Sequence, residues 1–133
     1  NVADKATFFA EVFRVLKPGG RFAFEAVTAG NGEPVHLPTF WASAPEHNWL
    51  VTRDELGALL TAAGFAAIGI EDTTAAVLES SRRRRVANHG DDPTLLGIHL
   101  NVPDDAGTKM ANALRNIEDG RTATVKGLAV RPA

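Results

Sequence analysis

The sequence predicts an α/β fold, and two stretches of the chain carry that prediction. Residues 4–16 show the spacing of an amphipathic helix and lead through a Pro-Gly turn into an apolar strand at 21–28. Residues 53–63 repeat this order, because a second amphipathic helix leads into an extended run at 66–72. Helices that alternate with strands in this way are typical of α/β proteins, in which helices pack against a central sheet.

The first helix is expected over residues 4–16. Its apolar side chains recur at helical spacing and form one buried face, which consists of Phe9, Val12, Phe13 and Leu16. Pro18 ends the helix, and the Pro18-Gly19 pair fits the two central positions of a type II turn. The chain then enters the strand at 21–28 directly.

The strand at 21–28 is apolar on both faces apart from Glu25. Its other side chains fall into two sets, Phe22, Phe24 and Ala26 on one face and Ala23 and Val27 on the other. Strands of this kind lie in parallel sheets with helices over both faces. An unpaired flank of such a strand is a template for another chain, so we expect a homo-oligomer or a separate partner segment to complete the sheet.

The helix at 53–63 carries the strongest local signals. Thr52 and Glu55 form a capping box at its start, and Gly64 follows its end, where a left-handed residue belongs. Its buried stripe consists of apolar side chains at helical spacing, namely Leu56, Leu59, Leu60 and Ala63. Together with the strands at 21–28 and 66–72, this helix forms a βαβ unit.

The rest of the chain is expected to hold a helix at 74–85, a short helical turn at 93–99, a helix at 104–119 and a final strand at 121–131. The helix at 104–119 has one apolar face, formed by Met110, Leu114 and Ile117. Asp119-Gly120 then turns the chain into the final strand.

Two sequence motifs point to a family. The run RVLKPGGRF occupies residues 14–22, and the run LLTAAGF occupies residues 59–65. In this order they resemble the second half of the class I S-adenosylmethionine-dependent methyltransferases, and the chain is similar to the members that methylate quinones, tocopherols or sarcosine. The resemblance covers residues 1–72 and implies a Rossmann-like sheet whose final strand runs antiparallel between its neighbours. It also implies S-adenosylmethionine as the cofactor.

The family's cofactor-binding motifs are missing from this sequence. The resemblance leads one to expect a Gly-rich turn after a first strand and an acidic residue after a second. The one GxG run, Gly30-Asn31-Gly32, leads into Glu33-Pro34 and not into a helix, so we interpret it as a loop. We therefore expect residues 1–133 to be a single incomplete domain that lacks the cofactor-binding N-terminal half and has no cofactor-binding residues of its own.

The loop at 29–51 is where chemistry is expected, since a long connection in a compact domain is typical of a binding loop or a lid. We interpret it as a substrate cover. Its candidates are two general bases and three aromatic contacts, with one carboxylate from the preceding strand: His36, His47, Phe40, Trp41, Trp49 and Glu25. Surface histidines, aromatic side chains that pack the loop onto the core, and an ion pair at Glu25 would account for the same residues.

Composition excludes several classes of function. The net charge of −2 gives no electrostatic footprint for nucleic acid or a membrane surface. The absence of cysteine removes disulfides, thiolate nucleophiles and cysteine-based zinc sites. His89 and His99 have no second ligand at a suitable spacing, so we assign no metal site. No targeting or membrane-spanning run is found, and we expect a cytoplasmic protein.

A run of four arginines, Arg82 to Arg85, closes the helix at 74–85. It fits a patch for phosphate or an acidic partner. It also fits a solvated helix end, because cations near a helix C-terminus are favoured by the helix dipole.

The function predicted from these observations is methyl transfer from S-adenosylmethionine to a small-molecule substrate. This chain would supply the substrate-side half and the lid loop at 29–51. Two alternatives stay open. One is a non-catalytic fragment that dimerises or binds a partner, such as the N-terminal half, through its sheet edge. The other is a small-ligand binding protein that uses the Trp-bearing loop without a methyl donor.

Overall fold

The computed structural model describes residues 1–87 and 105–133. Its elements in chain order are α1 (Lys5–Val15), β1 (Arg21–Ala29), the short 3-10 helix η1 (Pro45–His47), α2 (Arg53–Ala62), β2 (Ala66–Asp72), α3 (Thr74–Ala87), α4 (Ala106–Glu118) and β3 (Thr122–Val130). Each of these helices and strands except η1 was predicted to within two residues. The predicted turn at 93–99 lies outside the described residues.

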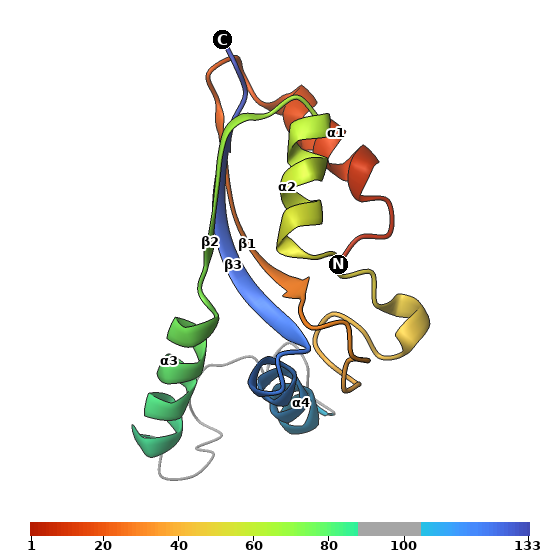
Figure 1. The fold of residues 1–133 in the computed structure, drawn as a ribbon, viewed down its shortest axis with the longest axis vertical. Helices are drawn as coiled ribbons and strands as arrows, with labels where there is room; N and C mark the ends of the chain where they lie inside the picture. The colour runs from red at the N-terminus through yellow and green to blue at the C-terminus, as the bar shows by residue number, and fades with distance from the viewer. Residues whose placement is uncertain (88–104) are drawn as a thin grey trace.

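The three strands form one sheet in the order β1-β3-β2 (Figure 1). β3 runs antiparallel to both neighbours, so β1 and β2 run parallel to each other on either side of it. The prediction of parallel strands with an antiparallel final strand between them is confirmed. In this register Lys126 of β3 lies opposite Glu25 on one side and Glu71 on the other.

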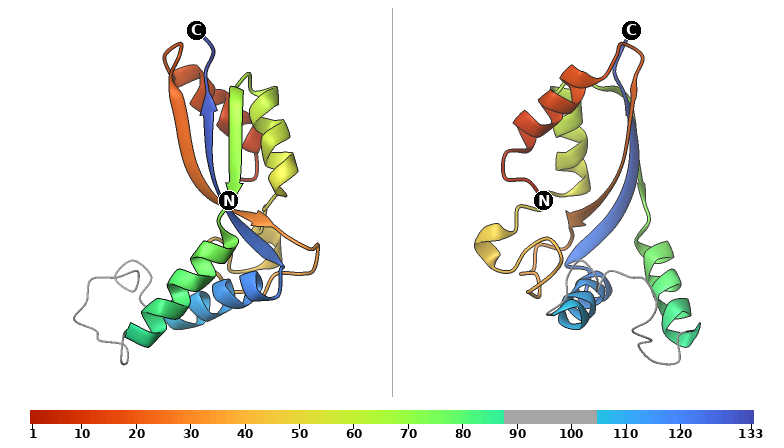
Figure 2. Two further views of the ribbon diagram at one scale, coloured as in Figure 1. Left: turned by 60° about the vertical axis from the view of Figure 1, so that its left-hand side comes forward. Right: turned by 180° about the vertical axis from the view of Figure 1, so that it is seen from behind.

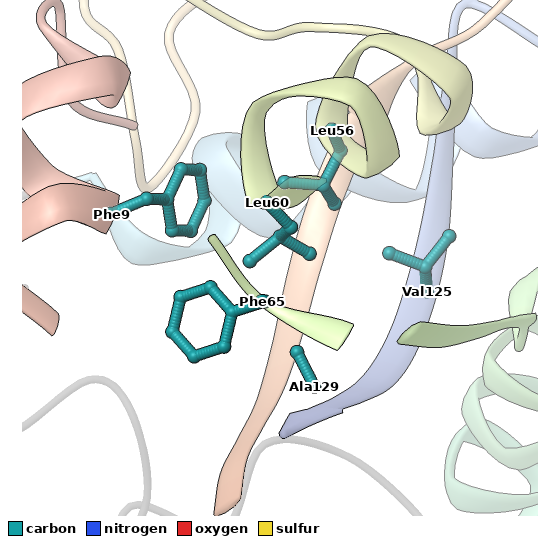
Figure 3. Close-up of a cluster of buried hydrophobic side chains, with 6 residues drawn as sticks. All are labelled: Phe9, Leu56, Leu60, Phe65, Val125 and Ala129. Carbon is teal, nitrogen blue, oxygen red and sulfur yellow. The ribbon is translucent and has the colours of Figure 1, made fainter. Parts of the chain in front are cut away.

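The helices α1 and α2 lie side by side over one face of the sheet (Figures 1 and 2). Between them and the sheet lies a core of buried apolar side chains, Phe9, Leu56, Leu60, Phe65, Val125 and Ala129 (Figure 3). The predicted capping box is present, because Thr52 and Glu55 each bond the other's backbone N–H. Gly64 has φ +99°, as expected of the residue that ends α2.

Six of the seven phenylalanines form a connected series of ring contacts across this core. The series runs from α1 through β1 to the start of β2 and consists of Phe8, Phe9, Phe22, Phe24, Phe65 and Phe13. The ring of Phe24 lies over Gly127 of β3, where an added Cβ would come within 2.2 Å of the ring. Only glycine at this position lets the ring pack against the strand.

The C-terminal residues tie β3 to the end of α1. The guanidinium of Arg131 donates to the carbonyls of Phe13 and Leu16 at 2.9 and 2.7 Å, and it lies 4.7 Å from the centre of the Phe13 ring. A cation at a helix C-terminus satisfies carbonyls that have no partner within the helix. The apolar face predicted for α1 is thereby fixed against the sheet.

At the opposite end of the sheet lie α3 and α4 (Figure 2). α3 joins the sheet through Thr73 and Thr74, which bond Thr124 of β3. In the arginine run of α3, Arg83 pairs with Glu79 at 2.9 Å and is exposed. This pair fits the interpretation of a solvated helix, and the patch for an acidic partner stays a prediction.

The other face of the sheet carries no helix over its centre among the described residues. It is hollowed, with a volume of about 720 Å³, and Glu25, Lys126, Glu71 and Leu128 are among the residues that line it. Lys126 pairs with Glu71 at 3.2 Å. The expectation that helices cover both faces of β1 is therefore met on one face only within residues 1–87 and 105–133.

Candidate functional site: the anchored loop

The connection between β1 and α2, residues 30–52, contains only the 3-10 turn η1 as regular structure. We call it the anchored loop, because side chains from other parts of the chain hold its backbone at both ends. One set of anchors comes from α4 and the turn into β3. The other set comes from the first residues of the chain.

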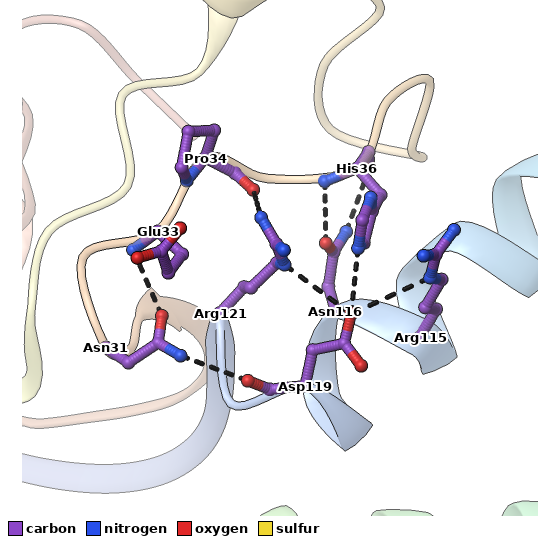
Figure 4. Close-up of polar contacts among 8 residues, drawn as sticks. All are labelled: Asn31, Glu33, Pro34, His36, Arg115, Asn116, Asp119 and Arg121. Atoms are coloured by element: carbon purple, nitrogen blue, oxygen red, sulfur yellow. Dashed lines mark hydrogen bonds and ion pairs between the residues drawn. The ribbon is translucent and has the colours of Figure 1, made fainter.

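The α4 anchor centres on Asn116, which is 0% exposed. Its Oδ1 accepts from the backbone N–H of His36 at 2.7 Å, and its Nδ2 donates to the carbonyl of His36 at 2.9 Å (Figure 4). One helical turn earlier, Asn112 donates to the carbonyl of Pro38 at 3.0 Å. Residues four apart lie on one face of a helix, so α4 presents both amides to the same stretch of loop.

The imidazole of His36 is held by a carboxylate. Its Nε2 lies 2.8 Å from Oδ2 of Asp119, and Arg115 and Arg121 lie 3.6 and 3.5 Å from the same oxygen. The hydrogen bond from His36 is the main cause that lowers the pKa of Asp119, and the charges of the two arginines and of His36 add to it. Asp119 is therefore an ionised partner that orients the ring.

The beginning of the loop packs against the turn between α4 and β3. The N–H groups of Gly30 and Asn31 donate to the carbonyls of Arg121 and Gly120 at 2.9 and 2.8 Å. The side chain of Arg121 donates in turn to the carbonyl of Pro34. The stretch 30–38 is thus bonded along its length to one neighbouring segment.

The N-terminal anchor holds the second half of the loop. The amide of Asn1 donates to the carbonyls of Trp41 and His47 at 2.9 and 2.6 Å and accepts from the N–H of Trp49 at 2.9 Å. Lys5 donates to the carbonyl of Trp49, and burial lowers its pKa. No local sequence pattern indicates these contacts, because they join residues 40 to 48 positions apart.

The structure brings some of the predicted site residues together and separates others. The rings of His47 and Trp49 lie 6.1 Å apart, and Trp49 is 41% exposed. Trp41 donates to Asn48 at 3.1 Å within the loop. His36 lies at the α4 anchor, so the two candidate bases are held by different anchors.

Two further candidates lie apart from the anchors. Phe40 is half-buried within the loop. Glu25 lies in the middle of β1 and lines the hollow of the open sheet face, opposite Lys126. The structure thus places Glu25 where the alternative of an ion pair can form, and its role as a substrate contact stays a prediction.

A groove of about 220 Å³ runs beside β1, between the start of α1 and the last residues of the anchored loop. Its walls are mainly apolar and include Val2, Phe8, Phe24, Val27 and Val51. Ligands of open α/β sheets bind near the carboxyl ends of strands, and the groove reaches Thr28 close to that end of β1. An apolar part of a small molecule fits this lining.

Sequence reasoning missed the α4 anchor. The one available signal was a pair of asparagines, Asn112 and Asn116, at a spacing of four in a helix that otherwise buries Leu114. Buried amides need hydrogen-bond partners, but the sequence does not say which backbone supplies them. The predicted apolar face is also only partly correct, since Met110 is exposed.

The described residues contain no cluster of three or more His, Cys, Asp or Glu side chains that could hold a metal ion. Within the same residues, no helix is both long enough and apolar enough to cross a membrane.

Comparison with known proteins identifies the class that this fold represents. No family model matches the chain. Its fold matches that of the Haemonchus contortus phosphoethanolamine N-methyltransferase 2 in complex with S-adenosyl-L-methionine, with a TM-score of 0.70, 20% identity and coverage of 99% of this chain and 31% of that chain. The fold is therefore the α/β fold of S-adenosylmethionine-dependent methyltransferases, as the motifs at 14–22 and 59–65 predicted.

A sequence relative agrees with this class. The chain is 32% identical over 99 residues to the ubiquinone/menaquinone biosynthesis C-methyltransferase UbiE of Xylella fastidiosa (strain M12), a match that covers 59% of this chain and 39% of the relative. The [4+2]-cyclase SpnF has a similar fold, with a TM-score of 0.57, 21% identity and coverage of 96% of this chain and 44% of that chain. The chain spans less than half the length of each of these proteins.

Proposed function

We propose that this chain is the substrate-side part of an S-adenosylmethionine-dependent methyltransferase that acts on a small molecule. The observation that carries the proposal is the 32% identity to a quinone C-methyltransferase. The anchored loop supports it, because a loop held at both ends can form a fixed wall over a substrate. The cofactor would be bound mainly by residues that this chain does not contain.

Methyl transfer requires little of the protein beyond positioning of the two reactants. Methyl transfer is an in-line displacement at a sulfonium carbon, so the acceptor atom must be close, aligned and shielded from water. A base is needed only when the acceptor carries a proton. His36 is the better candidate, because Asp119 orients its ring at 2.8 Å, whereas His47 has Ser43 at 3.5 Å.

The similar fold of a [4+2]-cyclase means that fold alone does not decide the reaction. The test must therefore measure methyl transfer. We expect a longer polypeptide that contains this sequence to bind S-adenosylhomocysteine in a calorimetric titration and to transfer label from S-adenosyl-[methyl-³H]methionine to a hydroquinone, a phenol or an amine. The 133-residue chain alone should bind the cofactor product weakly or not at all.

Variants of the longer polypeptide test the site. Trp41→Ala and His36→Gln should lower turnover, and His47→Gln serves as the matched histidine control. Glu25→Gln tests the carboxylate in the same way. Unchanged turnover in the first two variants would refute the site assignment, while absence of both cofactor binding and label transfer would refute the function.

The partner that the sheet needs is the second part of the proposal. In antiparallel pairing, alternate residues direct both backbone groups to one side. The N–H of Ala29 bonds the carbonyl of Val51, away from β3, so the backbone groups of Ala23, Glu25 and Val27 also point to this outer edge. Among the described residues no strand pairs with this outer edge, because β1 is an edge strand whose one neighbour is β3. We propose that a strand from the cofactor-binding half of the same methyltransferase domain pairs there.

Amide hydrogen exchange of β1 tests this pairing with an internal control. In the 133-residue chain the amides of Ala23, Glu25 and Val27 should exchange fast, while those of the intervening residues, which bond β3, exchange slowly. In the longer polypeptide all of them should be protected. Protection in the 133-residue chain together with a dimer in sedimentation equilibrium would assign the edge to a second copy and refute the proposed partner.

A further inference from the structure

We infer that Asn116 of α4 is the positioning residue of the anchored loop: its buried amide fixes the backbone of His36 and thereby directs the imidazole onto Asp119. The inference rests on the proposed function, since it concerns the same loop and the same candidate base. It assigns a role to a residue that lines neither the groove beside β1 nor the hollow of the open sheet face.

The first argument is the geometry of the contact. The side-chain amide of Asn116 pairs with the peptide groups of His36 through both its oxygen and its nitrogen, at 2.7 and 2.9 Å. An amide that bonds the N–H and the C=O of one residue fixes both the position and the rotation of that stretch of backbone. A single hydrogen bond, such as the 3.0 Å bond from Asn112 to Pro38, leaves the rotation free.

The second argument is burial. Asn116 is fully buried, so its amide cannot exchange its hydrogen bonds to His36 for hydrogen bonds to water if the contact opens locally. A polar group left unpaired in such a place is destabilising, because it has lost its hydrogen bonds to water without gaining others. The amide of Asn116 and the backbone of His36 therefore hold each other in place. In this position of the loop, both groups of the amide have hydrogen-bond partners.

The third argument links the backbone to the ring. Asp119 follows Asn116 by three residues at the end of α4, so both groups that hold His36 belong to one helix end. The backbone of His36 is bonded by the first and the imidazole by the second. Arg115 and Arg121 face the same carboxylate and keep Asp119 ionised. Because the backbone bond and the bond to the ring come from the same helix end, the direction of the ring is tied to the backbone contact.

The test compares two truncations on one helix face. Asn116→Ala removes both bonds to His36, and the matched control Asn112→Ala removes one bond to Pro38. We expect the His36 amide to exchange about tenfold faster or more in Asn116→Ala, corresponding to about 1.4 kcal/mol, and little faster in Asn112→Ala. The amides of β3 should keep their protection in both variants.

A second readout separates positioning from general loosening. In Asn116→Ala the carboxyl ¹³C titration of Asp119 should move toward the ordinary aspartate range, because the bond from His36 is its main perturbation. A variant that was merely destabilised would not change this titration at temperatures where the protein stays folded. Unchanged exchange at His36, or equal effects in the two variants, would overturn the inference.

An isosteric variant covers the case in which Asn116→Ala does not fold. In Asn116→Asp the ionised carboxylate still accepts from the N–H of His36 but cannot donate to its carbonyl, whereas the protonated acid does both. Protection of the His36 amide, corrected for the intrinsic pH dependence of exchange, should therefore rise relative to the unsubstituted chain as the pH falls through the pKa of the introduced group. A constant ratio would overturn the inference.

These readouts need no methyl donor. A longer polypeptide without methyltransferase activity would therefore refute the proposed function. The positioning role of Asn116 would still be decided by the exchange and titration measurements. In an active polypeptide, Asn116→Ala should lower kcat/KM more than Asn112→Ala does. Equal values of kcat/KM would overturn the link from the anchor to catalysis.

Discussion

Replacement of Leu60 by alanine is expected to lower the free energy of unfolding by about 2–5 kcal/mol. Leu60 is 0% exposed and lies in the core between α2 and the sheet (Figure 3). Truncation removes its buried methyl groups and leaves a cavity in the core that it shares with Phe9 of α1, Phe65 of the turn before β2 and Ala129 of β3. These three segments are fixed separately and cannot all move inward. Urea denaturation followed by circular dichroism measures the change.

The matched control is Leu128→Ala. Leu128 is 40% exposed and lines the hollow of the open sheet face, so the same truncation should cost less than about 1 kcal/mol in the chain alone. Equal losses in the two variants would mean that the open face is packed as tightly as the core. A small loss for Leu60→Ala would contradict the assigned core.

The second large effect is expected from Gly30→Ala. A Cβ at this position would lie 2.1 Å from the carbonyl oxygen of Gly120 and 2.9 Å from the carbonyl carbon of Arg121. Both atoms belong to backbone, which cannot swing aside as a flexible side chain does. Overpacking of this kind costs about 1–3 kcal/mol and occasionally more. The strain falls on the root of the anchored loop, so its release should also speed amide exchange at Asn31.

Gly69→Ala is the control for Gly30→Ala. Gly69 lies in β2, and a Cβ there would have no atom within 4 Å. It should change the free energy of unfolding by less than about 1 kcal/mol. If thermal and urea unfolding gave Gly30→Ala the stability of the unsubstituted chain, the close packing of the loop root against the turn at 120–121 would be wrong.

The Gly30-Asn31-Gly32 run was correctly interpreted as a loop, although the sequence does not show why glycine is needed there. Its sequence context excluded a phosphate-binding turn, because Glu33 and Pro34 follow where a helix would be needed. The structure supplies the reason for the first glycine, which is the close approach of Gly120. It also gives Asn31 a role, since its side chain donates to the carbonyl of Asp119 at 3.0 Å.

The sequence by itself determined the elements and the class of fold. Helix periodicity, the capping box at Thr52 and Glu55, and the turns at Gly19 and Gly64 are local features, so each could be predicted within a window of a few residues. The family motifs added the place of the final strand, which no local pattern defines.

Only the tertiary structure decided how the loop is held and which residues hold it. Asn116 meets His36 across 80 positions of sequence, and Asn1 meets Trp49 across 48. Hydrogen bonds of this kind depend on where the fold brings a side chain and a distant stretch of backbone together. The sequence does not indicate which partner a buried asparagine bonds. The candidate bases could therefore be named from their side-chain chemistry, whereas their anchors required the packing of α4 against the loop.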